Sequence, residues 1–144
     1  MTGFSDTWLI VPCYNEGTVI FDVLSHARET FPNIVAVNDG SHDNSAEQIR
    51  AAGAHLVNHP VNLGQGAAIQ TGVEYARAQP GAKYFVTFDA DGQHQVKDVA
   101  RMVERLRTEP LDIVVGTRFA GQDNSQVPWI KRVVCLLYTS DAAD

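Results

Sequence analysis

Short apolar runs alternate along the chain with segments of helical periodicity. Runs such as 8–11 are continuous and apolar, which is typical of strands covered on both faces of a sheet. Strands are expected at 8–11, 34–37, 55–58, 84–88 and 113–115, and helices at 19–27, 45–52, 64–79 and 96–106. Ser45 and Gln48 have the spacing of a capping box that opens the second helix. The alternation predicts an α/β domain of three layers around a mostly parallel, doubly wound sheet.

Composition agrees with a folded domain and narrows the partners. Of the 144 residues, 44% are hydrophobic and 19% are charged, which excludes a disordered chain. The net charge of −6 argues against a nucleic-acid partner, although backbone amides and a divalent cation can bind phosphate in an acidic site. The two cysteines form no disulfide or metal framework, and no apolar run approaches the ~18 residues of a membrane span. We expect a cytoplasmic protein.

The last ten residues differ in character from the rest. Residues 135–144 read CLLYTSDAAD, which resembles a sequencing adapter translated in frame. We therefore expect one domain over 1–134, with its C-terminal part missing, and a non-native tail over 135–144. Such a tail should contribute little to the core. Without Asp141 and Asp144, the net charge would change from −6 to −4.

Unusual residues gather after the predicted strands. Open α/β sheets bind ligands beyond the carboxyl ends of their strands, where the loops after the strands meet. The loops after the first four strands read PCYNE, NDGSHD, HPVNLGQG and DADGQH. The opposite strand ends carry ordinary turn residues, and this asymmetry predicts a site at the carboxyl edge.

Asp89 and Asp91 form a D-x-D pair after the fourth strand. Residues two apart on an extended backbone point the same way, so both carboxylates can face one cation. Mg²⁺ and Mn²⁺ prefer oxygen ligands, and Gln93 could add a neutral oxygen. The alternative is an Asp-Gly turn that caps the following helix, and for an isolated D-x-D that alternative is favoured.

Asp39 and Glu16 each permit two interpretations. At the end of a buried strand, the Asp39 carboxylate could accept hydrogen bonds from a base N–H or a ribose hydroxyl, or it could form an Asx-turn in which Gly40 has positive φ. Glu16 could bind ribose, or its charge could favour a helix N-terminus.

Three further features follow the same strand ends. Gly64-x-Gly66 could let a helix N-terminus approach an anion, or it could serve close helix packing. Arg118 could clamp a phosphate or lie on the surface. Cys13 has no base partner in its motif, so we interpret it as small and buried and not as a nucleophile.

Taken together, the motifs resemble one enzyme family. In chain order they are Pro12-Cys13-Tyr14-Asn15-Glu16, Asn38-Asp39-Gly40-Ser41, Asn62-Leu63-Gly64, Asp89-Ala90-Asp91-Gly92-Gln93-His94 and Gly116-Thr117-Arg118-Phe119. The string resembles the inverting glycosyltransferases of family two, and within them the polyprenyl-phosphate glycosyltransferases. The resemblance runs from about Trp8 to Arg132.

The resemblance implies a GT-A fold with a Rossmann-like nucleotide-binding half, a GDP- or UDP-linked sugar donor and a Mg²⁺ or Mn²⁺ cofactor. It implies a polyprenyl phosphate acceptor at the membrane surface, no nucleic acid, and a peripheral position at the inner membrane face through a segment beyond Val134. Matching positions would bind the donor through Pro12, Tyr14, Glu16, Asp39, Asn62, Gly64 and Asp89. Asp89, Asp91 and Gln93 would surround the metal, and Asp91 and Arg118 would be catalytic.

Departures from the family pattern leave alternatives open. Family members often carry Lys or Arg near Gln65, and many have a proline where this chain has Gln95-Val96. The acceptor-binding segment would follow Trp129–Arg132. The alternatives are transfer to a sugar hydroxyl, which would need a carboxylate base, and a donor-binding module without transfer activity. A nucleotidyltransferase or a dehydrogenase-type module would carry a glycine-rich loop directly after the first strand, and Pro12–Glu16 is not one.

Overall fold

The fold is built on a single mixed sheet. The computed structural model describes residues 3–90, 96–108, 113–117 and 134–139, the last two ranges for the backbone alone. The strand order is β3-β2-β1-β4-β6-β5. The strands are β1 (Thr7–Cys13), β2 (Asn33–Asp39), β3 (His55–His59), β4 (Tyr84–Thr87), β5 (Ile113–Thr117) and β6 (Val134–Thr139). The pairs among β1 to β4 are parallel, whereas β6 runs antiparallel to both β4 and β5.

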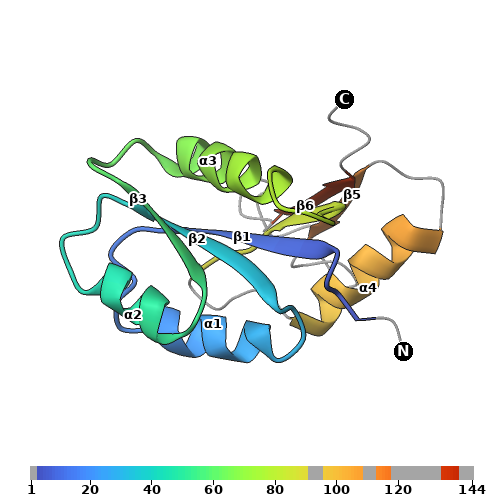
Figure 1. Ribbon diagram of the computed structural model, residues 1–144, viewed down its shortest axis with the longest axis horizontal. Coiled ribbons are helices and arrows are strands. Elements are labelled where there is room, and N and C mark those ends of the chain that lie inside the picture. The colour runs from blue at the N-terminus through green and yellow to red at the C-terminus, as the bar shows by residue number, and fades with distance from the viewer. Residues whose placement is uncertain (1–2, 91–95, 109–112, 118–133, 140–144) are drawn as a thin grey trace, which may run out of the picture.

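Helices cover both faces of this sheet (Figure 1). The helix α3 (Gln65–Arg77) lies on one face, and α1 (Ile20–Arg28), α2 (Ser45–Ala51) and α4 (Val96–Thr108) lie on the other. This arrangement confirms the predicted three-layer α/β architecture. No helix among the described residues is long and apolar enough to cross a membrane.

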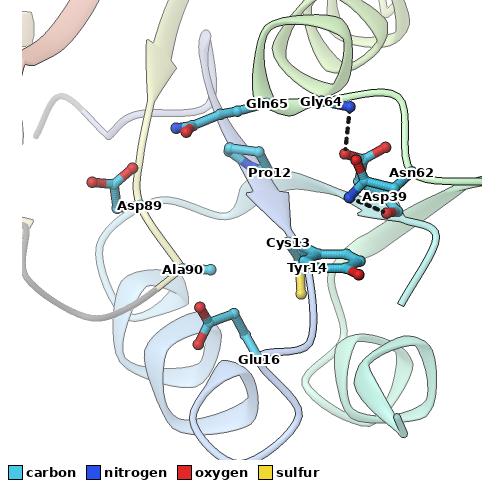
Figure 2. Close-up of a pocket in the computed structure, with 10 residues that line it drawn as sticks. All are labelled: Pro12, Cys13, Tyr14, Glu16, Asp39, Asn62, Gly64, Gln65, Asp89 and Ala90. Atoms are coloured by element: carbon cyan, nitrogen blue, oxygen red, sulfur yellow. Dashed lines mark hydrogen bonds between the residues drawn. The ribbon is translucent and has the colours of Figure 1, made fainter. Parts of the chain in front are cut away.

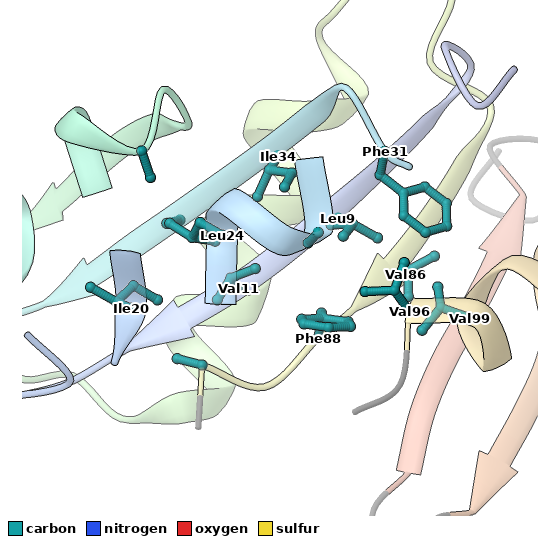
Figure 3. Close-up of a cluster of buried hydrophobic side chains, with 14 of the residues drawn as sticks. Leu9, Val11, Ile20, Leu24, Phe31, Ile34, Val86, Phe88, Val96 and Val99 are labelled. Carbon is teal, nitrogen blue, oxygen red and sulfur yellow. The ribbon is translucent and has the colours of Figure 1, made fainter. Parts of the chain in front are cut away.

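Alternation along β1 divides the core into two parts. Leu9 and Val11 pack with Ile20 and Leu24 of α1 and with apolar residues of α4 (Figure 3). Trp8 and Ile10, which alternate with them along β1, face α3. Gly72 of α3 allows close contact there, because a Cβ on it would lie 2.5 Å from the Ile10 Cγ2 methyl. Both faces of β1 and β2 are therefore buried, which explains their continuous apolar runs. The parallel pairing of β1 to β4 places the carboxyl ends of these strands at one edge.

Residues 134–139 are part of the sheet. The sequence predicts that residues 133–144 contribute little to the core, whereas the structure places β6 between β4 and β5 and pairs it with both. Residues 134–139 are therefore a strand of the sheet, which the sequence does not predict, and their small contribution to the core stays a prediction. Every polar backbone group within a sheet needs a partner, and β6 supplies partners to β5. The non-native origin of these residues remains a prediction from their sequence alone.

Deleting residues 135–144 should release β5 from the sheet. In the described part of the chain, β5 pairs with β6 alone. Amide exchange at 113–117 should therefore approach that of an unprotected chain after the deletion, while β1 and β2, which pair with each other, keep their protection. Hydrogen–deuterium exchange of both chains measures this. Unchanged protection of 113–117 would show that β6 is not the partner of β5 in solution.

Candidate functional site

A pocket of about 450 Å³ lies at the carboxyl edge of the sheet. Its lining comes from the ends of β1, β2 and β4 and from the loop between β3 and α3, and comprises Pro12, Cys13, Tyr14, Glu16, Asp39, Asn62, Gly64, Gln65, Asp89 and Ala90. Figure 2 shows Asp39, Asn62 and Gly64 on one side of the end of β1, and Asp89 and Ala90 on the other. The loops after the strands therefore meet around one pocket, at the edge where the sequence predicts a site.

The Asp39 carboxylate is the most constrained polar group of the pocket. Its side chain is only 4% exposed. One oxygen, Oδ1, accepts hydrogen bonds from the Leu63 N–H at 2.8 Å and from His59 Nδ1 at 2.9 Å. The other, Oδ2, accepts the Gly64 N–H at 3.0 Å (Figure 2). Asp39 therefore ties the end of β2 to the loop that leads into α3.

Backbone contacts strengthen the same junction. Asn62 Nδ2 donates to the Asp39 carbonyl at 3.2 Å. Gly40 has a φ of 73°, and a Cβ on it would lie 2.4 Å from the Asn62 nitrogen, so the chain after β2 and the loop touch without room for a side chain. The Asx-turn that the alternative predicts for Asp39 is not formed, because the Ser41 N–H donates to the side chain of Asn38, three residues before it. The Asp39 carboxylate is thus left for the loop and the pocket.

The imidazole of His59 connects Asp39 with α3. His59 is the residue that faces Asp39 in the parallel register of β2 and β3. Since a carboxylate only accepts hydrogen bonds, His59 Nδ1 must carry a proton, and its Nε2 lies 2.8 Å from the hydroxyl of Thr71 on α3. The ring is 8% exposed, so it is almost wholly enclosed by the protein.

These contacts determine the ionisation of Asp39. Burial by itself would raise the pKa of the carboxyl group. The hydrogen bonds from the Leu63 N–H, His59 and the Gly64 N–H favour the anion and outweigh burial, so the pKa of Asp39 lies below its ordinary value. Asp39 is therefore an anion at neutral pH, held at the N-terminus of α3 where the helix dipole also favours negative charge.

A second set of hydrogen bonds joins the loop after β1 to the loop after β2. The Asn15 N–H donates to Ser41 Oγ at 2.9 Å, and the His42 N–H donates to Asn15 Oδ1 at 2.8 Å. Asn15 has a φ of 53°, a conformation that asparagine tolerates better than most residues. This double contact fixes the backbone directly after Tyr14, a residue that is 45% exposed and lines the pocket.

Asp43 and Ser45 fix Glu16 and its neighbour. Asp43 Oδ2 accepts the Gly17 N–H at 3.0 Å, and Ser45 Oγ accepts the Glu16 N–H at 3.1 Å. Ser45 also donates both its hydroxyl and its N–H to Asp43 Oδ1. The bond from the Ser45 hydroxyl, together with the bonds from the Gly17 and Ser45 N–H groups, holds the pKa of Asp43 below its ordinary value. The predicted capping box is therefore wrong. Asn44 is the N-cap of α2, and the Ser45 hydroxyl serves the neighbouring loop.

The other side of the pocket carries the carboxylates of Asp89 and Glu16. Carboxylate oxygens are the donors that Mg²⁺ and Mn²⁺ prefer, so these side chains fit the chemistry of such a cation. Within the described ranges no group of three His, Cys, Asp or Glu side chains forms a complete metal site. The predicted ligands Asp91 and Gln93 and the predicted phosphate contact Arg118 lie outside the described residues.

Cys13 is 2% exposed, as the sequence predicts. Burial raises the pKa of its thiol, which keeps it protonated and a weak nucleophile.

The sequence motifs do not identify the residues that support the pocket-lining residues through hydrogen bonds. His59, Thr71, Asp43 and Ser45 all form hydrogen bonds to groups of the site or its loops, yet none of them was a candidate from the sequence. For His59 a signal existed, because it ends the third strand just as Asp39 ends the second, and neighbouring parallel strands align there.

Asp39→Asn should lower the free energy of unfolding by about 1–3 kcal/mol at pH 7, because an amide cannot accept from all three donors and leaves a buried N–H without a partner. The folded pKa is lowered, so this contribution is complete above the ordinary Asp pKa of about 3.9 and is lost as pH falls below it. Urea unfolding from pH 7 to pH 3 should therefore show the two proteins converging.

Glu74→Gln is the matched control, since it makes the same chemical change on an exposed face of α3. It should change the free energy of unfolding by less than about 0.5 kcal/mol at every pH. An Asp39→Asn protein as stable as the wild type at pH 7 would contradict the assigned contacts.

Comparison with known proteins places these features in a family. The model of the family "Glycosyl transferase family 2" matches residues 8–140. A UDP-N-acetylglucosamine–dolichyl-phosphate N-acetylglucosaminyltransferase of Methanococcus voltae is 30% identical over 145 residues, covering 88% of this chain and 57% of the relative. An undecaprenyl-phosphate 4-deoxy-4-formamido-L-arabinose transferase of Pseudomonas aeruginosa is 32% identical over 142 residues, covering 89% and 40%.

The fold is shared with solved structures. Glucosyl-3-phosphoglycerate synthase from Mycobacterium tuberculosis, solved with Mn²⁺, UDP and glucosyl-3-phosphoglycerate, superposes with a TM-score of 0.60 at 21% identity. The match covers 74% of this chain and 42% of that one. This likeness confirms the GT-A fold expected from the sequence.

The chain spans about half the length of the curated relatives it matches, with shares of 53%, 40% and 57%. Since the family model matches nearly all of the chain, and relatives at 30% identity or more cover most of it, the chain belongs to glycosyl transferase family 2.

Proposed function

We propose that this chain is the donor-binding part of an inverting glycosyltransferase that moves a sugar from a nucleoside diphosphate to a polyprenyl phosphate. The observation that carries the proposal is the pocket with two chemically different sides. One side holds an ionised Asp39 on a rigid frame, and the other holds Asp89 with Glu16. The named activities of the two polyprenyl-phosphate relatives support this acceptor class.

Asp39 is suited to the nucleoside. An ionised carboxylate has about four acceptor sites, and three described hydrogen bonds use both sites of Oδ1 and one of Oδ2. The remaining site accepts a ligand N–H or O–H, which a base imino group or a ribose hydroxyl supplies. Pro12 and Tyr14 line the pocket beside Asp39 and offer apolar surface to the base.

Asp89 is suited to the diphosphate through a cation. The described lining includes the carboxylates Glu16, Asp39 and Asp89 and no basic side chain, with Gln65 at the N-terminus of α3. A diphosphate entering this lining would meet like charge, so it needs a positive partner. Bound Mg²⁺ or Mn²⁺ would neutralise the charge that develops on the departing diphosphate. Asp89 would hold the cation together with Asp91 and Gln93, and Asp91 and Arg118 would act at the reacting phosphates.

Transfer with inversion follows from attack on the face opposite the nucleotide. A phosphate oxygen of the acceptor forms a bond to the anomeric carbon, and the bond from that carbon to the diphosphate breaks, its electron pair leaving with the nucleoside diphosphate. A phosphate acceptor is already anionic near neutral pH, so it needs positioning and no strong base. The chain's own residues would hold the nucleotide-sugar in a fixed position, because hydrogen bonds immobilise the loops around the pocket.

Nucleotide binding tests the proposal. UDP or GDP should bind this chain in the presence of Mg²⁺ or Mn²⁺, and excess EDTA should weaken the binding roughly tenfold or more, the equivalent of about 1.4 kcal/mol, because the diphosphate then meets the carboxylates unscreened. Asp89→Asn should reduce the dependence on the cation. Titration calorimetry with each nucleotide, with and without EDTA, measures both effects.

Asp98→Asn is the control, because Asp98 lies on the exposed side of α4 in an ion pair with Arg101, away from the pocket lining. It should leave the affinity and its cation dependence unchanged. Absence of binding by both nucleotides, or binding that is indifferent to EDTA, would contradict the proposal. Release of nucleotide that polyprenyl phosphate accelerates and a simple glycoside does not would support the lipid acceptor over a sugar hydroxyl.

A further inference from the structure

We propose that His59 and Thr71, neither of which lines the pocket, are positioning residues for nucleotide binding, because they orient the Asp39 carboxylate toward the ligand. This inference rests on the proposed function, in which Asp39 accepts a hydrogen bond from the nucleoside. It concerns a chain of contacts that runs from α3 through the end of β3 to the end of β2.

His59 is well placed for this role. In the described part of the chain it is the one side chain that bonds to the Asp39 carboxylate, since the other donors are the backbone N–H groups of Leu63 and Gly64. Those two donors belong to a single loop. The imidazole belongs to β3 and approaches the carboxylate from another side. Together with the loop donors it therefore restrains rotation of the carboxylate plane.

The orientation of the carboxylate decides what a ligand can reach. With His59 and Leu63 both on Oδ1, that oxygen has no free acceptor site, and the open site is on Oδ2 beside the Gly64 N–H. If the carboxylate turned, Oδ1 and Oδ2 would exchange environments and the open site would move. Fixing the plane therefore fixes the point at which a nucleoside donor is bound.

Thr71 controls the state of the imidazole. Nδ1 carries a proton toward Asp39, so in the neutral ring Nε2 is an acceptor, and the Thr71 hydroxyl 2.8 Å away can donate to it. This bond selects the tautomer whose Nδ1–H faces the carboxylate, much as a second partner orients the histidine of a metal site. Thr71 lies on α3, so the same contact also joins the helix to the strand.

Substitutions at position 59 can remove the hydrogen bond to Asp39 and the hydrogen bond to Thr71 one at a time. An asparagine amide reaches about where Nδ1 lies and can keep the bond to Asp39, whereas a glutamine amide reaches about where Nε2 lies and can keep only the bond to Thr71. With UDP or GDP, whichever binds, His59→Gln and His59→Leu should weaken affinity roughly tenfold, and His59→Asn should stay within about threefold of wild type. Thr71→Val should weaken binding, and Thr71→Ser should restore it.

Nucleotide analogues distinguish positioning from a general loss of structure. The probes are the 2′-deoxy nucleotide, which lacks the 2′-hydroxyl, and the nucleotide methylated at the base imino nitrogen, which lacks that N–H. Each analogue thus lacks one hydrogen-bond donor from which Asp39 could accept. In the wild type, at least one analogue should bind more weakly than the parent nucleotide. His59→Leu and Asp39→Asn should both abolish that discrimination, because the hydrogen bond from the nucleoside to Asp39 is then already lost. His59→Asn should retain it.

The chain contains a matched control on the same strand. His55 begins β3 and its Nδ1 lies 3.1 Å from the hydroxyl of Tyr75 on α3, so it makes a contact of the same kind at the other end of the strand. His55→Leu should leave nucleotide affinity and discrimination unchanged. Thermal unfolding of each variant shows how much of any effect is loss of folded protein.

The outcomes separate the two claims. If neither UDP nor GDP binds the wild type, the proposed function fails and this inference fails with it. If a nucleotide binds and His59→Leu weakens the parent nucleotide and both analogues by the same factor, His59 has a structural role only and this inference alone is overturned. If a nucleotide binds and the wild type discriminates against neither analogue, Asp39 accepts from neither the base imino group nor the 2′-hydroxyl, and the proposed role of Asp39 is overturned together with this inference.

Discussion

A buried carboxylate that accepts three hydrogen bonds organises the functional edge of this domain. Asp39 ends a strand whose side chains are buried on both faces, and an unpaired charge there would be costly. The Leu63 and Gly64 N–H groups and His59 remove that cost. The same bonds fix the conformation of the loop between β3 and α3, because two of its N–H groups must point at one carboxylate. The shape of the pocket on this side therefore depends on the ionisation of one residue.

The motifs at the other strand ends hold the loops in place and also line the pocket. Asn15 and Asp43 bond across two loops, and these bonds leave Tyr14 and Glu16 free to line the pocket. Asn38 and Asp39 have different partners: Asn38 accepts the Ser41 N–H within its own loop, and Asp39 accepts from the loop between β3 and α3 and lines the pocket. Loops held this firmly before a ligand arrives reduce the entropy that binding must overcome, which is the benefit of preorganisation.

Much of this fold could be predicted from the sequence, because apolar periodicity reports burial directly. The runs at 8–11 and 34–37 are buried strands, and the loops after them form the site edge. Side-chain contacts between distant residues have no such periodic signal, so the sequence does not identify His59 and Thr71. For the same reason it predicts a capping box for the Ser45 hydroxyl, which instead accepts the Glu16 N–H. The placement of β6 was missed because its composition suggested a foreign tail, whereas pairing in a sheet depends on backbone groups that every sequence carries.

The central claim is that an ionised Asp39 holds the loop into α3, and NMR titration of the side-chain carboxyl carbon of Asp39 together with the Leu63 and Gly64 amides tests it most directly. The account predicts that all three signals change together with one midpoint below the ordinary Asp value of about 3.9, because protonation breaks the bonds that lower the pKa. A midpoint at or above that value, or amides of Leu63 and Gly64 that do not respond while the carboxyl group titrates, would contradict it.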